Sequence, residues 1–232
     1  MRIATLPDQA WVDSVGEVPG VELRAWDMVA PLPEEHRAGV GFVVHPYFTD
    51  IRRVGNAAGL ADLQVVHLLT AGYETALPYL PDGAQLCNAA GVHDASTAEL
   101  TMALTLASLR AVPPFVRAQD RGEWLPLRIW PSLTDRRVLI IGYGRIGKAI
   151  ARRMLPFEVS VTAVASRARG GDDLVDQVHG ITEVYDLLPH HDVVVLITPL
   201  NEQTSELVDE RFLAAMPDGA LVVNMARGKV VK

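Results

Sequence analysis

Short apolar runs alternate with amphipathic stretches along the first ninety residues. Runs of roughly four to eight apolar, often β-branched residues between turn signals are typical of buried strands. They predict strands at residues 2–6, 21–26, 41–45, 64–70 and 84–90, and the stretches between them predict helices near 8–15 and 50–58. Strands that alternate with helices and are apolar along most of their length indicate a parallel sheet covered on both faces. We therefore expect a small α/β domain over residues 1–93.

A long helix is predicted at residues 96–110, with Asp94 or Ser96 as its N-cap. Its apolar positions are too dense for a surface helix, so we expect it to lie between two domains. Pro113–Pro114 predicts its end, and we expect a second helix to follow as far as Arg121.

Residues 138–154 have the order strand, glycine turn, amphipathic helix. In such a unit Gly142 permits a tight turn, Gly144 lets a diphosphate approach the backbone, and Gly147 lets the helix pack against the strand. The first N–H groups of the helix lack partners within it and favour an anion. The pattern predicts a dinucleotide site; the alternative is a glycine-rich turn that binds nothing.

The remaining pattern continues the same α/β order. Apolar runs predict strands at 159–165, 192–198 and 220–224, and a helical region is expected from Thr204 toward Met216. Residues 94–232 are therefore expected to form a second domain with a parallel sheet.

The segment after the strand predicted at 159–165 bears on the choice of cofactor. An acidic residue about twenty positions beyond the glycines usually binds the ribose 2′-OH of NAD. Here the strand is followed by Ser166, Arg167 and Arg169, without a carboxylate. A hydroxyl and two guanidinium groups suit a 2′-phosphate. We therefore expect NADP(H) to be preferred, with NAD(H) possible; the alternative is that the arginines lie on a solvated loop.

Composition narrows the function classes further. The chain has 232 residues, 49% of them hydrophobic, with a net charge of −7. Because both charge signs are interspersed, we expect no nucleic-acid partner. No apolar run approaches the ~20 residues of a membrane span, and the N-terminus lacks a signal-peptide pattern, so we expect no membrane partner. Cys87 is the single cysteine, which excludes an internal disulfide and fits a cytoplasmic location.

Taken in order along the chain, several segments carry a resemblance to a known family. They are LLTAGYE (68–74), the helix of residues 96–110, RGEW (121–124), VLIIGYGRIG (138–147), LITPLNEQT (196–204) and NMARG (224–228). The chain resembles the D-isomer-specific 2-hydroxyacid dehydrogenases, which include glyoxylate and hydroxypyruvate reductases. The resemblance implies a flavodoxin-like substrate domain over 1–93 and a Rossmann dinucleotide-binding domain over 94–232 that includes the interdomain helix 96–110.

The resemblance also implies an activity, which is hydride transfer between NADP(H) and a small 2-keto or 2-hydroxy acid. Backbone N–H groups around Ala71, Gly72 and Tyr73 would hold the substrate carboxylate, since successive amides suit an anion. Arg227 matches the catalytic arginine and, being always protonated, can polarise the keto acid but cannot act as the base. The expected cofactor-binding residues are Thr97, Gly142, Gly144, Arg145, Ile146, Gly147, Ser166, Arg167, Arg169, Thr198, Pro199, Met225 and Ala226. A homodimer is expected, and no metal site.

The sequence departs from the family pattern after Arg227. The family's acid/base histidine and its glutamate partner lie beyond that arginine, whereas this sequence ends five residues after it. The motif matches none of the seven histidines, of which His45 and His93 lie near strand ends. We therefore expect a C-terminally truncated member with slow turnover at best. The alternatives are a catalytically incompetent dinucleotide-binding fragment and an NAD-dependent relative such as phosphoglycerate or formate dehydrogenase.

The same departure predicts that the strand at 220–224 lies at the edge of its sheet. Unpaired strand edges favour association. We expect the chain to associate through this edge or to be marginally stable.

Overall fold

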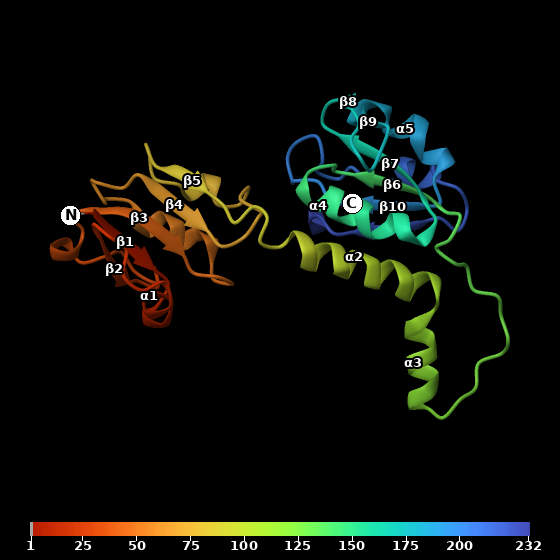
Figure 1. The fold of residues 1–232 in the computed structure, drawn as a ribbon, viewed down its shortest axis with the longest axis horizontal. Coiled ribbons are helices and arrows are strands. Elements are labelled where there is room, and N and C mark those ends of the chain that lie inside the picture. The colour runs from red at the N-terminus through yellow and green to blue at the C-terminus, as the bar shows by residue number, and fades with distance from the viewer. Residues whose placement is uncertain (1) are drawn as a thin grey trace. The chain divides into compact units, whose positions relative to one another are not determined.

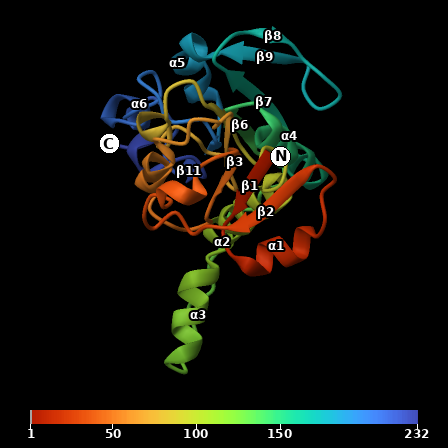
Figure 2. The same ribbon diagram turned by 90° about the vertical axis from the view of Figure 1, so that its left-hand side faces the viewer.

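The computed structural model describes residues 2–232 (Figure 1; Figure 2 shows it turned by 90°). The chain divides into two compact units, Met1–His93 and Asp94–Lys232. In the part of the chain that is described, no helix has both the length and the apolar character needed to cross a membrane.

The first unit is built on a five-stranded sheet in the order β2-β1-β3-β4-β5, with every neighbouring pair parallel. The strands are β1 (Arg2–Leu6), β2 (Val21–Ala25), β3 (Val40–His45), β4 (Val65–Leu68) and β5 (Gln85–Cys87). Helix α1 (Gln9–Val15) follows β1, and Asp8 caps it by accepting a hydrogen bond from the Trp11 N–H. The parallel order confirms the α/β prediction for this half of the chain.

Two predictions in this unit need correction. Residues 50–58 form a 3-10 helix, Ile51–Ala57, in place of an α-helix; Gly55 and Asn56 have low helix propensity. The strand predicted at 84–90 ends at Cys87. Beyond it, Asn88 donates from Nδ2 to the Ala71 carbonyl and Ala89 N–H donates to the Thr70 carbonyl, so the chain turns to the loop after β4.

The second unit contains a six-stranded sheet in the order β11-β10-β6-β7-β9-β8. Its strands are β6 (Arg137–Ile141), β7 (Ser160–Ala165), β8 (Arg169–Gly170), β9 (Gln177–Gly180), β10 (Val193–Leu196) and β11 (Leu221–Asn224). All pairs are parallel except β8 with β9. Within the described residues β11 is an end strand, paired with β10.

Helices cover both faces of the second sheet. They are α2 (Asp94–Leu109) and α4 (Arg145–Met154) on one face, and α5 (Val184–Leu187) and α6 (Glu210–Ala214) on the other, whereas α3 (Val112–Asp120) extends away from the sheet (Figure 1). Val138 and Ile140 of β6 pack in one core with residues of α2 and α4, whereas Leu139 and Ile141 pack in another with residues of α5 and α6. Because successive strand residues point to opposite faces, burial on both sides explains why β6 is apolar from Val138 to Ile141.

Three boundaries in the second unit differ from the sequence prediction. Helix α2 begins at Asp94, so neither Asp94 nor Ser96 precedes it as a cap. It ends before Ala111, which has a left-handed φ of 53°. Pro113–Pro114 lies in the first turn of α3, where the missing N–H of proline costs nothing. The prolines therefore begin a helix and do not end one.

The helix expected from Thr204 toward Met216 also begins later than predicted. Residues 201–206 form a polar turn, Val208 makes a β-bridge with Val231, and α6 begins only at Glu210, capped by Asp209. The physical reason is the side chain of Asn201, whose Oδ1 accepts hydrogen bonds from the N–H groups of Gln203 and Thr204 and so stabilises the turn.

Candidate functional site

The glycine turn between β6 and α4 is fixed by close backbone packing. Gly142 has a φ of 113°, and a Cβ added there would collide with the Ile197 carbonyl. A Cβ at Gly147 would meet the Gly142 carbonyl oxygen. Gly144, the N-cap of α4, has an extended φ of −96° and open space where its Cβ would lie. Two glycines are therefore required by the fold, and the third leaves room beside the helix N-terminus.

A pocket of about 370 Å³ opens at the carboxyl ends of β6, β7 and β10. In open α/β sheets ligands bind in this position. The lining residues are Ile141, Gly142, Tyr143, Gly144, Val164, Ala165, Ser166, Arg169, Ile181, Ile197, Thr198, Pro199, Asn201, Gln203 and Thr204. Among these described residues Arg169 is the only one with a charged side chain. The pocket therefore combines apolar walls with a cation beside the glycine turn.

Tyr143 ties the glycine turn to the segment after β7. Arg169 donates from Nη2 to the Tyr143 carbonyl at 2.7 Å, and the Tyr143 hydroxyl donates to Asp172 Oδ1 at 3.0 Å. Lys148 Nζ lies 2.8 Å from Asp172 Oδ2 and, through this contact, holds the pKa of Asp172 at about 2. Burial and the adjacent Asp172 carboxylate raise the pKa of the Tyr143 phenol. The phenol therefore stays a neutral donor to a charged acceptor.

A second wall of the pocket is the turn after β10. Besides the two bonds to Asn201 Oδ1, the Thr204 hydroxyl donates to the Pro199 carbonyl at 2.6 Å and accepts from the Asn201 N–H at 2.9 Å. These bonds keep the turn of residues 199–204 rigid, with Gln203 on the pocket lining.

The pocket brings together six of the expected cofactor residues, namely Gly142, Gly144, Ser166, Arg169, Thr198 and Pro199. Thr97, Arg145, Ile146, Gly147, Arg167, Met225 and Ala226 are not among the lining residues. Of these, Arg145 donates from Nε to Asp94 Oδ2 at 3.0 Å, and the Thr97 carbonyl accepts from the Thr101 hydroxyl. Arg167 is exposed.

Sequence reasoning did not select Tyr143, Ile181, Asn201, Gln203 or Thr204 as lining residues. A signal existed for two of them. Asn201 followed three positions later by Thr204, directly after a buried strand and Pro199, is typical of a side-chain-capped turn. Ile181 carried none, because the short strand β9 that positions it was not predicted.

Arg227 follows β11 in a turn held by Asn224. Asn224 donates from Nδ2 to the Arg227 carbonyl at 3.0 Å, and its Oδ1 accepts from the Ala226 N–H at 3.0 Å. The Arg227 side chain is exposed, with Nη1 2.9 Å from the Ala226 carbonyl.

The loop after β4 in the first unit contains Ala71, Gly72 and Tyr73, for which the family resemblance implies a role in binding the substrate carboxylate. The Thr70 hydroxyl donates to the Gly72 carbonyl at 2.8 Å, and Asn88 holds the Ala71 carbonyl. The Tyr73 N–H donates to the carboxylate of Glu74 at 3.0 Å. An amide of this loop therefore binds a carboxylate oxygen already, supplied by the neighbouring side chain.

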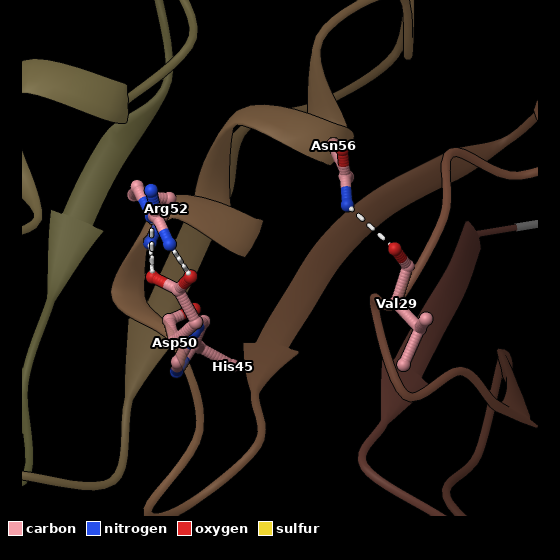
Figure 3. Close-up of polar contacts among 5 residues, drawn as sticks. All are labelled: Val29, His45, Asp50, Arg52 and Asn56. Carbon is pink, nitrogen blue, oxygen red and sulfur yellow. Dashed lines mark hydrogen bonds and ion pairs between the residues drawn. The ribbon is translucent and has the colours of Figure 1, made fainter.

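The two histidines near strand ends both contact backbone carbonyls. His45 is buried, its Nε2 is 3.2 Å from the Asp50 carbonyl, and burial lowers its pKa. Figure 3 shows it next to the Asp50–Arg52 ion pair at the start of the 3-10 helix. His93 Nε2 is 3.1 Å from the Leu69 carbonyl, and its ring stacks on Tyr47 with centroids 5.9 Å apart.

The same helix is attached to the loop after β2. Figure 3 shows Asn56 with Nδ2 directed at the Val29 carbonyl, 3.3 Å away, and the same amide donates to the Met28 carbonyl at 2.8 Å. Hydrogen bonds thus attach the 3-10 helix at two places: His45 contacts the Asp50 carbonyl at its start, and Asn56 near its end bonds the loop after β2.

The chain is similar to known proteins of one family. A family model described as D-isomer specific 2-hydroxyacid dehydrogenase, NAD binding domain, matches residues 102–232. The chain is 29% identical over 221 residues to human glyoxylate reductase/hydroxypyruvate reductase, covering 90% of this chain and 67% of that protein. It is 34% identical over 157 residues to glyoxylate reductase of Thermococcus onnurineus, covering 64% and 47%. This chain thus spans about half to two thirds of the length of these relatives.

Two solved structures share the fold. One is an NADPH-dependent glyoxylate/hydroxypyruvate reductase from Sinorhizobium meliloti in complex with NADP and sulfate, with a TM-score of 0.79 and 22% identity, covering 100% of this chain and 75% of that one. The other is a D-lactate dehydrogenase from Aquifex aeolicus complexed with NAD and lactic acid, with a TM-score of 0.76 and 21% identity, covering 100% and 71%.

Proposed function

Because this chain belongs to the D-isomer specific 2-hydroxyacid dehydrogenases, we propose that it serves hydride transfer between a nicotinamide dinucleotide and a small 2-keto or 2-hydroxy acid. Glyoxylate and hydroxypyruvate are the first substrates to test, since the similar human protein carries both names. The second unit would bind the dinucleotide and the first the acid. The bound nicotinamide would supply or accept the hydride.

One observation carries the choice of NADP(H) over NAD(H). Ser166 and Arg169 lie in the lining of the pocket that contains Gly142 and Gly144, and none of the described lining residues is Asp or Glu. A carboxylate there would favour a ribose 2′-OH and repel a 2′-phosphate, whereas a guanidinium binds phosphate through charge-assisted hydrogen bonds. The fold does not decide this, because the two similar structures carry NADP and NAD.

The roles of the chain's own residues follow from their chemistry. The N-terminus of α4 beside Gly144 suits the diphosphate. The amides around Gly72 would hold the substrate carboxylate, as the Tyr73 N–H holds Glu74. Arg227, protonated at any working pH, would orient and polarise the keto oxygen without exchanging a proton. His45 and His93 contact backbone carbonyls, so we assign neither as the proton donor.

Titration of the purified chain with NADPH and NADH, followed by the reduction assay with glyoxylate and hydroxypyruvate, tests this proposal. We expect NADPH to bind more tightly than NADH. Turnover would support the dehydrogenase function, and binding without turnover would restrict the function to dinucleotide binding. Equal or tighter binding of NADH would contradict the cofactor preference, and failure to bind either nucleotide would contradict the proposed function as a whole.

We also propose that the chain forms a homodimer through α3 and the segment that follows it. In Figure 1 this segment extends away from the rest of the second unit. Trp124, Leu127 and Ile129 are 92%, 99% and 97% exposed. Exposed apolar side chains gathered in this way mark an interaction surface, because each is costly to leave in water. A second copy would cover them with the same residues in an isologous contact.

A further inference from the structure

The segment of residues 169–172 is bonded to the glycine turn at both of its ends. At its start, the Arg169 guanidinium donates to the Tyr143 carbonyl at 2.7 Å. At its end, Asp172 Oδ1 accepts from the Tyr143 hydroxyl at 3.0 Å. Tyr143 is only 2% exposed, so packing fixes its ring between these two contacts. One residue of the turn therefore holds both ends of the segment, through its carbonyl and its phenol.

Asp172 is the residue at which the contacts of this region meet. Besides the phenol, its carboxylate accepts from the Leu174 N–H at 3.0 Å and lies 2.8 Å from Lys148 Nζ of α4. Its own N–H donates to the Val175 carbonyl at 2.9 Å and so closes the turn between β8 and β9. Asp172 therefore joins that turn to the glycine turn and to α4, and it fixes the position of the segment that begins with Arg169.

Asp172 itself stands outside the pocket. Neither Asp172 nor Lys148 is among the described residues that line it, whereas Tyr143 and Arg169 both are. A carboxylate also cannot attract a phosphate, because the two charges have the same sign. Any contribution of Asp172 to binding must therefore pass through the lining residues that it holds, which are Tyr143 by a direct bond and Arg169 through the segment that they share.

We propose that Asp172 is a positioning residue for Arg169 and thereby determines how strongly the pocket prefers NADP(H) to NAD(H). By anchoring the end of the segment to Tyr143 and to α4, it keeps the guanidinium at the glycine turn, where a 2′-phosphate would meet a cation that is already ordered. NAD has a 2′-OH in place of this phosphate, so its binding does not depend on that order. The inference rests on the proposed binding of the 2′-phosphate by Arg169.

Charge alone predicts the opposite effect for loss of this carboxylate. Replacing Asp172 by Ala removes a negative charge and releases Lys148 from its ion pair, and both changes would favour the additional phosphate of NADPH. A positioning role predicts weaker NADPH binding, because Arg169 must then be ordered when the ligand binds. The two explanations therefore differ in sign.

The adjacent Asp173 provides a matched control. Its carboxylate lies 3.9 Å from Arg152 Nη2 of α4, and its side chain is 78% exposed. D173A therefore makes the same change of charge as D172A, one position further along the chain, without removing a bond to Tyr143.

The experiment measures dissociation constants for NADPH and NADH in the wild type, D172A, Y143F, D173A, R169A and the double variant R169A/D172A. Since ordering one long side chain in advance changes affinity by roughly 2- to 12-fold, we expect D172A to weaken NADPH within that range and NADH by less than about twofold. Y143F removes the phenol bond without changing a charge and should also weaken NADPH more than NADH. D173A should bind NADPH at least as tightly as the wild type. In the R169A background, D172A should cause no further loss, because the residue that it positions is gone.

Unchanged or tighter NADPH binding in D172A would overturn the inference. Equal weakening of both nucleotides in D172A and Y143F would also overturn it, because it would indicate a purely structural role. A further loss of NADPH affinity on adding D172A to R169A would do the same, since Asp172 would then act without Arg169. If D172A does not fold, Y143F decides between these outcomes. All of them leave the wild-type preference for NADPH intact, whereas a wild-type chain that binds neither nucleotide, or prefers NADH, would overturn the proposed function itself.

Discussion

Arg169 donates a hydrogen bond from its guanidinium to the backbone carbonyl of Tyr143, 2.7 Å away, across the glycine turn. The two residues are 26 positions apart, and the short antiparallel pair of β8 with β9 brings them together. This bond fixes the direction of the guanidinium before any ligand binds. A preoriented cation loses less side-chain entropy on binding a phosphate.

Removal of that cation should change cofactor discrimination. Since a charge-assisted hydrogen bond contributes roughly 1.5–3 kcal/mol, we expect R169A to weaken NADPH binding by roughly 10- to 100-fold and NADH binding by less than about threefold. Fluorescence titration of both nucleotides measures this. R167A is the matched control, because Arg167 carries the same charge two positions away but lies outside the pocket lining; its effect should be smaller. Equal losses of NADPH and NADH in R169A would contradict the proposed role.

Alanine at two glycines of the same turn should have two different effects. At Gly142 a Cβ collides with the Ile197 carbonyl and φ is 113°, so we expect G142A to lower the free energy of unfolding by roughly 2–4 kcal/mol. At Gly144 the Cβ meets nothing within 4 Å, so G144A should fold with near-native stability. It should nevertheless bind NADPH at least about tenfold more weakly, because the methyl group occupies the space that a diphosphate needs. Denaturant unfolding combined with nucleotide titration separates the two effects, and wild-type affinity in G144A would argue against a diphosphate at this helix end.

The ion pair between Arg137 and Asp192 should make stability depend on pH. Arg137 donates from Nε and Nη2 to the two oxygens of Asp192 at 3.1 and 2.9 Å, and its N–H donates to Oδ2 at 2.9 Å. These contacts lower the pKa of Asp192 from 3.8 to about 2. Because the folded-state pKa is the lower one, the stabilisation is complete above pH 3.8 and is lost as pH falls toward 2.

We therefore expect D192N to cost about 1 kcal/mol at pH 7, a figure discounted for solvent screening at the half-exposed Arg137. The difference from the wild type should narrow between pH 4 and pH 2 in urea unfolding curves. E123Q is the control, since Glu123 forms an exposed ion pair with Arg121 and should leave the unfolding free energy unchanged at pH 7. A D192N penalty that stays constant with pH would show that the carboxylate charge is not its cause.

Substitution on the exposed apolar segment should alter self-association. If a second copy covers this surface, L127D places a charge where burial is required and should shift the sedimentation profile from dimer toward monomer. L213D is the matched control, because Leu213 is also exposed, at 51%, but lies on α6. An unchanged dimer in L127D would contradict the proposed surface. A dimer disrupted only by changes in β11 would support the alternative expectation of association through that edge.

The order of elements could be derived from the sequence because it depends on local patterns. Apolar runs placed β1, β3, β6, β10 and β11 within one or two residues of their observed bounds. The glycine turn was readable for the same reason, since Gly142 and Gly147 are required by backbone geometry within a single strand–turn–helix unit. The lack of a carboxylate after β7 was also visible, because it is a matter of which residues are present.

What the sequence alone could not determine depends on residues distant in the chain. In the sequence, Arg167 and Arg169 are equal candidates for binding a 2′-phosphate. In the structure only Arg169, which lies in β8 and pairs with β9, lines the pocket. The pattern after β10 suggested a helix, but side-chain bonds from Asn201 and Thr204 stabilise a turn. Only the folded structure shows that the Thr198 hydroxyl is buried without a hydrogen-bond partner. The periodicity of apolar residues indicates which side of a helix or strand is buried. Tertiary packing determines which polar atoms form hydrogen bonds within the protein, and this difference distinguishes a ligand site from an ordinary loop.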